Sequence, residues 1–423
     1  MKLCIQDGLL INPKTDTQEI TDIWIEDGKI IEIGKNNHHI ADQTIHAAGK
    51  WVVPGLIDLH VHFREPGFEH KEDIKSGCEA AAKGGFTTVC CMPNTSPVID
   101  NECIVEYIKT MAAKANGVNV LPVGAITKGQ EGETLANIGK MAEHGICAVS
   151  EDGKTVMDAG LMKKAMQYVK PFNIPIFSHT EDHSLAGGSM NAGENAQVFG
   201  IKGIPREAEE VIVARDIILA KYTGAKLHLS HMSTKGSIEL IRMAKMQGIA
   251  ITAETAPHYF TLDDGLLGDY DTNKKMNPPL RTKEDVKAMT IALKEGIIDV
   301  IATDHAPHHY DEKNVEFDKA PFGIVGLETS FAVSYTALVK AGILTPLELI
   351  DKMSTKPAEI LGLDKGSVEI GKTADITIID TTANYTIDPN TFVSKGKNTP
   401  FTGMQVSGEV VYTLVNGKII YQK

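Results

Sequence analysis

The stretch Gly55-Leu56-Ile57-Asp58-Leu59-His60-Val61-His62 joins a short apolar run to two histidines at alternate positions. On a β-strand, residues i and i+2 lie on the same face, so both imidazoles can point at one metal ion. A short apolar run that ends in polar residues is typical of a strand buried on both faces of a parallel sheet. We therefore expect a strand over residues 56–62 with a metal-binding pair at its carboxyl end.

Seven more runs of this kind follow along the chain, and stretches with helical spacing lie between them. Several of the helical stretches stop at glycine, which is a usual helix end. The seven runs are residues 87–94, 119–126, 146–152, 174–180, 226–233, 249–258 and 298–308. Eight strands alternating with helices predict a (β/α)8 TIM-type barrel of the α/β class. An open, doubly wound sheet is the alternative, but the chain has no Gly-x-Gly-x-x-Gly turn.

The two ends of the chain have a different pattern. Residues 26–31 and 415–420 each contain a turn dipeptide, Asp-Gly or Asn-Gly, beside short alternating runs, which indicates hairpins. Because the two hairpins are alike, we expect both ends to contribute to one small β-sandwich domain; two unrelated flanking sheets are the alternative. Residues 1–52 and 366–423 would form this domain, and residues 53–365 would form the barrel.

Composition excludes several classes of protein. The 423 residues are 42% hydrophobic and 23% charged, which is typical of a soluble globular protein and not of a disordered chain. A formal net charge of −13 argues against nucleic acid as a partner. No apolar run approaches the roughly 18 residues of a membrane span, and no secretory signal is visible. The six cysteines form no Cys-x-x-Cys pair, so we expect reduced thiols and a cytoplasmic protein.

The residues that close the runs are the candidates for chemistry, because a barrel carries its active site at the carboxyl ends of its strands. Imidazoles and carboxylates occur at the ends of five runs, and this donor set favours Zn²⁺, with Mn²⁺ or Co²⁺ as substitutes. Buried structural histidines and helix-capping aspartates are the alternative interpretation. The candidates are His60, His62, Glu151, Asp152, His179, His231 and Asp304.

Four stretches resemble the motifs of the dihydroorotase family, within the amidohydrolase superfamily. They are Gly55 to Gly67, Cys91-Met92-Pro93-Asn94-Thr95, Asn277-Pro278-Pro279-Leu280-Arg281 and Ala302-Thr303-Asp304-His305-Ala306-Pro307-His308. The resemblance spans nearly the whole chain in order. It implies a metal-dependent barrel that interconverts N-carbamoyl-L-aspartate and (S)-dihydroorotate in de novo pyrimidine synthesis.

The resemblance also implies the metal ligands and the branch of the family. One or two zinc ions per subunit would be held by His60, His62, Asp152, His179, His231 and Asp304. Many relatives bridge two metals with a carboxylated lysine on the fourth strand, whereas Ser150-Glu151-Asp152-Gly153 resembles the branch that uses an aspartate. Asp152 is therefore the expected bridge. Lys154, beyond the glycine, is the alternative.

Asp304 is the general base that the resemblance implies. A bound zinc lowers the pKa of water to about 7 and so supplies a hydroxide nucleophile for cleavage of a cyclic amide. Asp304 would take the proton of that nucleophile during ring opening and return it to the leaving nitrogen. In ring closure the roles reverse.

The substrate carboxylate needs a cationic partner. Arg64 lies two residues beyond His62 and would share its face on a continuing strand, where a guanidinium can bind a carboxylate through two bonds. A surface ion pair is the alternative role for Arg64. Asn94 and Asn277 can alternatively be turn formers. The other substrate contacts that the resemblance implies come from His62, Asn94, Asn277, His308 and the backbone of Phe322 and Gly323.

Two other functions stay open. A hydantoinase, dihydropyrimidinase or allantoinase would have the same barrel, but the missing lysine and the presence of Arg64 argue against these enzymes. A non-catalytic amidohydrolase-like scaffold would show an eroded ligand set, whereas every expected ligand type is present. The resemblance favours a homodimer and leaves open whether an aspartate transcarbamoylase partner is required.

Overall fold

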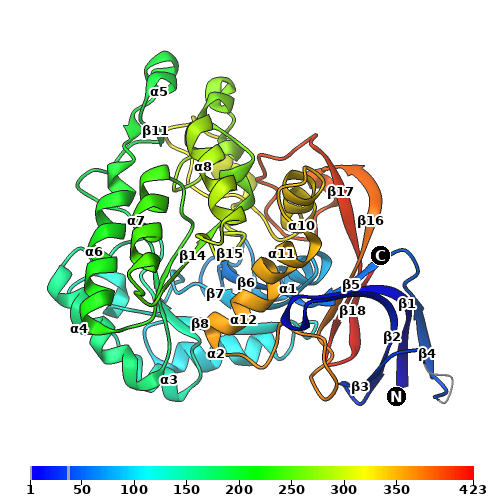
Figure 1. Ribbon diagram of the computed structural model, residues 1–423. Coiled ribbons are helices and arrows are strands. Elements are labelled where there is room, and N and C mark those ends of the chain that lie inside the picture. The colour runs from blue at the N-terminus through cyan, green and yellow to red at the C-terminus, as the bar shows by residue number, and fades with distance from the viewer. Residues whose placement is uncertain (1, 36–38) are drawn as a thin grey trace.

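Eight parallel strands, hydrogen-bonded in chain order, form the centre of the computed structural model, which describes residues 2–35 and 39–423. A parallel bridge between Val61 and His305 and a 2.8 Å bond from His62 N–H to His305 O join the last strand region to the first. Each predicted run contains one strand, so the (β/α)8 barrel is confirmed (Figure 1). The strands are β6 (Leu56–Val61), β7 (Phe86–Cys91), β8 (Asn119–Ala125), β9 (Ala148–Ser150), β10 (Ile176–Ser178), β13 (Leu227–Leu229), β14 (Ile251–Thr255) and β15 (Val300–Ile301).

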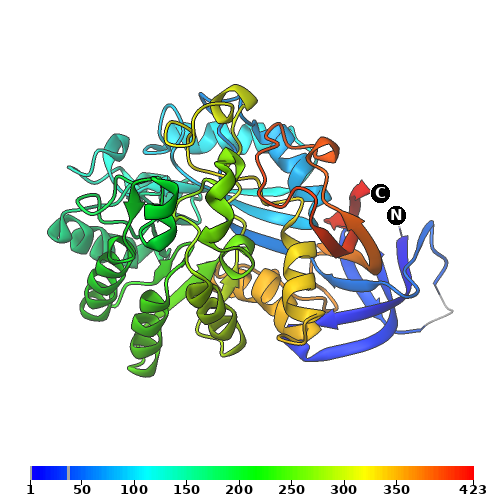
Figure 2. The same cartoon turned by 90° about the horizontal axis from the view of Figure 1, so that it is seen from above.

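Helices surround this sheet, as the view from above shows (Figure 2). Local sequence sets where they begin: α1 and α8 start with capping boxes, in which the N-cap residues Asp73 and Thr282 accept a backbone N–H. The helices are α1 (Ile74–Lys83), α2 (Glu102–Ala112), α3 (Ile138–Glu143), α4 (Ala159–Val169), α5 (Glu194–Phe199), α6 (Glu207–Thr223), α7 (Lys235–Met246), α8 (Lys283–Lys294), α9 (Tyr310–Lys313), α10 (Ser330–Ser334), α11 (Pro346–Ile350) and α12 (Lys356–Leu361). The short α5 stands beside a small parallel pair, β11 (Met190–Asn191) and β12 (Gly203–Ile204).

Alternating strand residues supply two hydrophobic clusters. In β7, Val89 and Cys91 pack with helix residues in the large cluster. Cys90 and Met92 instead join a second cluster with residues of other strands, including Phe177. Strands that are buried on both faces need this alternation, because a parallel barrel has no solvent-facing side.

Both termini build one sheet beside the barrel (Figure 1). In this sheet β5 pairs in parallel with β1 and antiparallel with β16, so it joins the N-terminal strands to the C-terminal ones. The two predicted hairpin turns also touch: a Cβ added to Gly28 would lie 2.8 Å from Asn416 O. Two unrelated flanking sheets were the wrong alternative. The strands are β1 (Lys2–Asn12), β2 (Thr17–Glu26), β3 (Lys29–Ile33), β4 (Gln43–His46), β5 (Trp51–Pro54), β16 (Ile376–Thr386), β17 (Gln405–Val415) and β18 (Lys418–Gln422).

The segment between β16 and β17 leaves this sheet and lies against the barrel. Its buried residues include Ser394 and Asn398, whose side chains bond to barrel residues. The domain boundaries at residues 52 and 366 stay a prediction.

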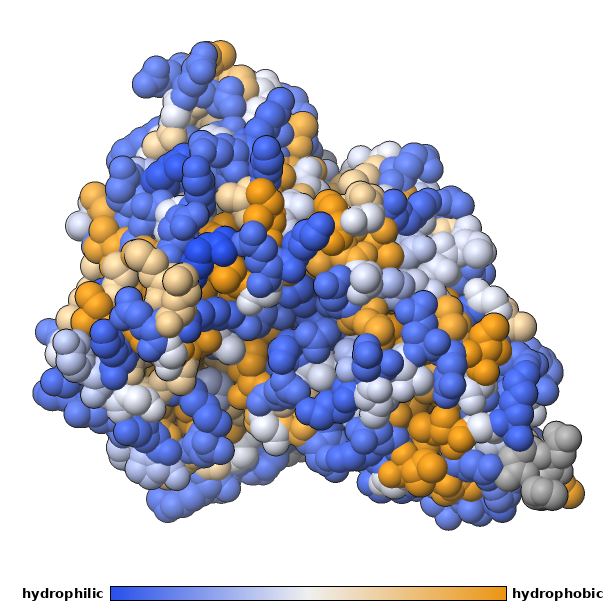
Figure 3. Space-filling model, in the orientation of Figure 1, coloured by the Kyte–Doolittle hydropathy of each residue, from blue (hydrophilic) through white to orange (hydrophobic). Residues whose placement is uncertain are grey.

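Hydrophilic side chains cover much of the face in Figure 3, and hydrophobic ones lie in scattered patches. Across residues 2–35 and 39–423, none of the helices is both long and apolar enough to traverse a bilayer.

Candidate metal centre and substrate pocket

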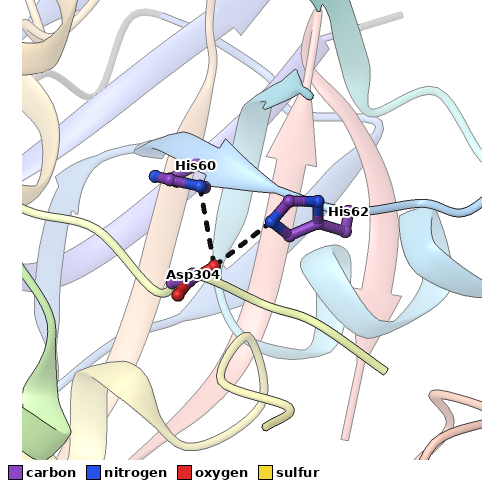
Figure 4. Close-up of side chains that lie close together, drawn as sticks. All are labelled: His60, His62 and Asp304. Atoms are coloured by element: carbon purple, nitrogen blue, oxygen red, sulfur yellow. Dashed lines mark hydrogen bonds and ion pairs between the residues drawn. The ribbon is translucent and has the colours of Figure 1, made fainter. Parts of the chain in front are cut away.

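Three side chains converge where β6 ends and β15 leads into its loop (Figure 4). The Nε2 atoms of His60 and His62 lie 3.5 and 3.2 Å from Oδ1 of Asp304. All three residues are buried, and together they could hold a metal ion. The predicted metal-binding pair at the end of β6 therefore points at a carboxylate from the opposite end of the barrel sequence.

Asp152, which follows β9, lies among four imidazoles. Its Oδ1 is 3.2 Å from His60 Nε2, 3.5 Å from His179 Nδ1 and 3.7 Å from His231 Nε2. Its Oδ2 is 3.4 Å from His62 Nε2. Asp152 thus lies between the His60–His62 pair and the His179–His231 pair, which is the place where a bridging ligand would be needed.

The charges of this cluster stabilise one another. Burial opposes the ionisation of Asp152, but nearby His60 and hydrogen bonds from His179 and His231 hold its pKa well below the usual range. Burial likewise disfavours protonation of His60, yet Asp152 and Asp304 raise its pKa well above the usual value. Buried carboxylates and imidazoles at this density are costly without a partner that binds them all.

The donor atoms fit a metal ion. Within residues 2–35 and 39–423, His60 Nε2 has no hydrogen-bond partner, although it lies beside two carboxylates. The opposite ring atom, Nδ1, is 2.7 Å from Glu254 Oε1. An ionised carboxylate can only accept a hydrogen bond, so Nδ1 carries a proton. In the neutral form of the ring, which is the form that binds a metal ion, the Nε2 lone pair would face the cluster. Burial raises the pKa of Glu254, but bonds from His228 and His60 outweigh it and bring the value to about 2.

Sequence reasoning missed Glu254. It lies inside β14, one of three barrel strands whose ends carry no candidate ligand, and it also contacts His228 at 3.1 Å. A lone glutamate within an otherwise apolar run was the signal that could have identified it, because a buried carboxylate needs bound partners.

Three candidate site residues have left-handed backbone: φ is 62° at Arg64, 40° at His231 and 49° at Asp304. Residues other than glycine adopt this region at an energetic cost, and such conformations gather at functional sites. β6 ends at Val61, so Arg64 does not share a strand face with His62, as it would have done on a continuing strand. Arg64 reaches the pocket through its turn.

A small pocket of about 150 Å³ opens above the cluster, and it contains most of the predicted site residues. This volume is below the range typical of drug-sized ligands, so it suits a small molecule. His60 and His308 do not line it directly, and Gly153 and Ala306 are lining residues that were not predicted. The predicted residues that line it are His62, Arg64, Asn94, Asp152, His179, His231, Asn277, Asp304, Phe322 and Gly323.

Arg64 makes no ion pair with a carboxylate among the described residues, which excludes a surface ion pair in this structure. Its Nε donates to Pro307 O at 3.2 Å, and its Nη2 lies 3.5 Å from His308 Nε2. His308 Nε2 is 2.8 Å from Phe322 O, so this nitrogen carries the proton. Burial, together with the charge of Arg64, lowers the pKa of His308 to about 3, so its ring is neutral.

The two asparagines contact ionisable neighbours. Asn94 Oδ1 lies 2.8 Å from His62 Nδ1, and its Nδ2 lies 3.4 Å from Asp152 Oδ2. Asn94 is not a helix N-cap, since Asn101 caps α2. Asn277 Nδ2 donates to Glu181 Oε1 at 3.1 Å, and Glu181 Oε2 in turn lies 3.7 Å from His179 Nε2. Both asparagines therefore face the pocket, and substrate binding by them stays a prediction.

Three further ionisable residues, Lys154, His305 and His258, are not among the candidate metal ligands. Lys154 Nζ donates to Gln130 O at 2.8 Å, so its ammonium is used away from Asp152. His305 contacts Glu72 and accepts the N–H of Gly326, as a supporting residue would. Burial lowers the pKa of His258 to about 4.

Residues 49–237 match the family model described as Dihydro-orotase-like, and residues 337–421 match the model described as Amidohydrolase family. A protein named Dihydroorotase from Acetivibrio thermocellus is 51% identical over 422 residues, which cover 100% of this chain and 99% of the relative. A protein of the same name from Geobacter metallireducens is 51% identical over 425 residues, with 100% of both chains covered.

Solved structures of cyclic amidases have the same fold. L-Hydantoinase (dihydropyrimidinase) from Arthrobacter aurescens superposes with a TM-score of 0.90 at 27% identity, covering 100% of this chain and 96% of the other. Dihydropyrimidinase from Brevibacillus agri gives a TM-score of 0.87 at 25% identity, covering 100% and 95%. The fold is thus common to several enzymes, and sequence identity over the full length distinguishes among them. The chain belongs to the dihydroorotase family of cyclic amide hydrolases, within the amidohydrolases.

Proposed function

We propose that the protein is a zinc-dependent dihydroorotase of the aspartate-bridged branch. It would interconvert N-carbamoyl-L-aspartate and (S)-dihydroorotate in de novo pyrimidine synthesis. The observation that carries the proposal is one small pocket in which Arg64 faces the same space as His62, Asp152 and Asp304. Full-length relatives named Dihydroorotase support the choice of substrate.

The metal would be held by His60, His62, Asp152, His179, His231 and Asp304. Imidazole and carboxylate donors in this number suit one or two zinc ions, with Asp152 between the two histidine pairs. When bound, zinc would polarise the amide carbonyl and lower the pKa of a water molecule.

Asp304 would move the proton. During ring opening the bond between the ring carbonyl carbon and nitrogen breaks, and the nitrogen needs a proton that the attacking water must lose. The Asp304 carboxylate can accept this proton from the water and deliver it to the leaving nitrogen. Bonds from the cluster keep this group ionised: although burial raises the pKa of Asp304, the nearby His60 and His62 lower it below its usual value. Ring closure follows the same path in reverse.

Arg64 would bind the substrate carboxylate. The guanidinium is half-buried, has no acidic partner among the described residues and lines the pocket, so a ligand carboxylate would complete its bonding. Asn94, Asn277, His308 and the Phe322–Gly323 backbone would hold the remaining polar groups. Gly323 N–H already donates to Lys275 O at 3.0 Å, so the substrate would contact other backbone atoms of Phe322 and Gly323.

The test is a metal-titrated assay on the isolated chain. Metal removed by chelation is restored as Zn²⁺, Mn²⁺ or Co²⁺, and cyclisation of N-carbamoyl-L-aspartate is followed at each step. We expect activity to rise with zinc and to saturate at one or two equivalents. A chain that binds zinc but turns over neither N-carbamoyl-L-aspartate nor dihydroorotate, both alone and with an aspartate transcarbamoylase added, contradicts the proposal.

The hydantoinase neighbours make a hydantoinase or dihydropyrimidinase the second candidate. Lys154 lies outside the cluster and Arg64 inside the pocket, which favours a substrate with a carboxylate. Turnover of dihydroorotate is to be compared with that of hydantoin, dihydrouracil and allantoin. Preference for any of the latter three would reverse the assignment.

We also propose a cytoplasmic homodimer. Light scattering measures its oligomeric state. Activity of the isolated chain in the assay above decides whether an aspartate transcarbamoylase partner is required.

A further inference from the structure

A residue from the far C-terminal part of the chain supports the wall of the pocket from behind, through bonds to the lining residues Ala306 and Gly323. Asn398 lies between β16 and β17 and is 3% exposed. Its Oδ1 accepts the N–H of His308 at 3.1 Å, and its Nδ2 donates to Ala306 O at 3.1 Å and Gly323 O at 3.0 Å. Its backbone carbonyl accepts the N–H of Val325 at 2.8 Å.

These bonds join the two ends of one loop. Ala306 and His308 lie where the loop leaves the barrel, and Gly323 and Val325 lie where it returns. A carboxamide offers two N–H donors and an oxygen acceptor, and Asn398 uses both donors and the acceptor here. An aspartate would lack the donors, and a glutamine would be too long for the same bonds. The bonding therefore requires asparagine.

The part of the pocket wall that Asn398 contacts is closely packed. Gly323 has φ of 133°, a conformation that side chains rarely adopt, and an added Cβ would lie 2.9 Å from Ala306 O and 3.0 Å from His308 Nε2. His308 is in turn bonded to Phe322 O. Movement of either end of the loop would thus displace all three of the substrate contacts predicted for this side of the pocket.

We propose that Asn398 is a positioning residue that fixes His308, Phe322 and Gly323 for substrate binding. This inference rests on the proposed function, and it gives the segment between β16 and β17 a part in forming the substrate pocket. Asn398 touches none of the candidate metal ligands among the described contacts, so its substitution should change substrate binding without changing metal binding.

The experiment compares Asn398→Leu and Asn398→Asp with the wild type after zinc loading. A displacement of about 1 Å in a binding group costs up to about 100-fold. We expect KM for both N-carbamoyl-L-aspartate and dihydroorotate to rise by about 10- to 100-fold, with kcat within about 3-fold and zinc content unchanged. Asn390→Asp is the matched control, because Asn390 is exposed on the same segment and, among residues 2–35 and 39–423, its side chain bonds only to Asp388.

Gly396→Ala tests the same contact without changing Asn398. Its new Cβ would lie 2.6 Å from Pro307 Cβ and 2.8 Å from Asn398 Oδ1, so it pushes the two segments apart. We expect KM to rise here too, and this variant decides the matter if both Asn398 variants fail to fold. Folded variants with wild-type KM, even with a lowered Tm, overturn the positioning role. An inactive wild type would instead contradict the proposed function, and the inference would fall with it.

Discussion

The proposed function places two demands on the side chain of Asp304, metal ligation and proton transfer. Its Oδ1 lies within 3.5 Å of Nε2 of both His60 and His62, and it also lines the pocket where a substrate would react. Its left-handed backbone, with φ of 49°, turns the carboxylate toward the cluster directly after β15. Ligation and proton transfer can therefore be separated only by a change that keeps the shape of the side chain.

Asp304→Asn is that change. The amide keeps an oxygen for the metal but cannot accept the proton, so we expect kcat to fall by about 100- to 10,000-fold. Steady-state kinetics and metal analysis on the same sample measure both properties. Asp311→Asn, an exposed aspartate of the same loop, is the control. Near-normal turnover with zinc retained would show that another group moves the proton.

Arg64 is the residue that should discriminate between substrates. Replacement by Lys keeps a positive charge but removes the planar fork, and replacement by Met removes both. A charge-assisted bond is worth about 1.5–3 kcal/mol, so we expect KM for dihydroorotate to rise about 10- to 100-fold in Arg64→Met and less in Arg64→Lys. Residual turnover of dihydrouracil, which lacks the carboxylate, should not change. An equal loss on both substrates would assign Arg64 to the structure of the loop.

At the level of elements, two lysines cross-link the loops that carry substrate residues. Lys313, at the end of α9, donates to Thr272 O at 3.0 Å, Lys275 O at 3.2 Å and Pro321 O at 2.8 Å. Lys275 donates to Phe317 O at 2.7 Å, and its Nζ lies 4.7 Å from the centroid of the Phe322 ring. Burial, and then the charge of Lys275, lowers the pKa of Lys313 to about 7. The loops after β14 and β15 thus form one unit.

Lys313→Met should loosen that unit. Three backbone carbonyls would lose a charged donor, although Thr272 O and Lys275 O each keep a backbone N–H. We expect the free energy of unfolding to fall by about 1.5–3 kcal/mol, measured by urea denaturation. Lys319→Met, at an exposed position in the same loop, should change it by less than about 0.5 kcal/mol. A similar small change in Lys313→Met would mean that water replaces the ammonium.

Much of the element pattern could be predicted from the sequence, because barrel strands are short apolar runs that end in polar residues. The pair His60 and His62 could be predicted for the same reason: strand periodicity places them on one face. Contacts set by distant segments could not be predicted. Lys313 and Asn398 carry no local signal, since their partners are backbone carbonyls and amides that only the folded chain brings near. The turn at Arg64 was missed because left-handed backbone is uncommon for arginine.

At the scale of the whole molecule, Glu72 ties three distant parts of the chain together. This buried carboxylate accepts bonds from Ser76 and Ser394, from Lys395 N–H at 3.2 Å, and contacts His305 Nε2 at 3.4 Å. Burial raises its pKa, but the bond and charge of His305 and the serine bonds outweigh this and lower the value below 4.5. The barrel and the C-terminal segment are therefore joined by a charged group.

The pKa of Glu72 makes its contribution to stability depend on pH. Because the folded state holds the proton less tightly than the unfolded state, the contribution is full above pH 4.5 and is lost as pH falls through the folded value. We expect Glu72→Gln to lower the free energy of unfolding by about 1.5–3 kcal/mol at pH 7, and by progressively less as pH falls below 4.5. Urea unfolding of both proteins between about pH 3 and 7 measures this, because the loss occurs below pH 4.5. A difference that stays constant below pH 4.5 would contradict the assignment.

The segment that carries Asn398 is synthesised after the barrel residues that it contacts. Every candidate metal ligand is synthesised before Asn398. The sheet that contains β1 is likewise complete only after β16 has been made, because β5 lies between β1 and β16. The wall proposed to receive the substrate can therefore form only after residue 398 has been synthesised, later than all of the candidate metal ligands.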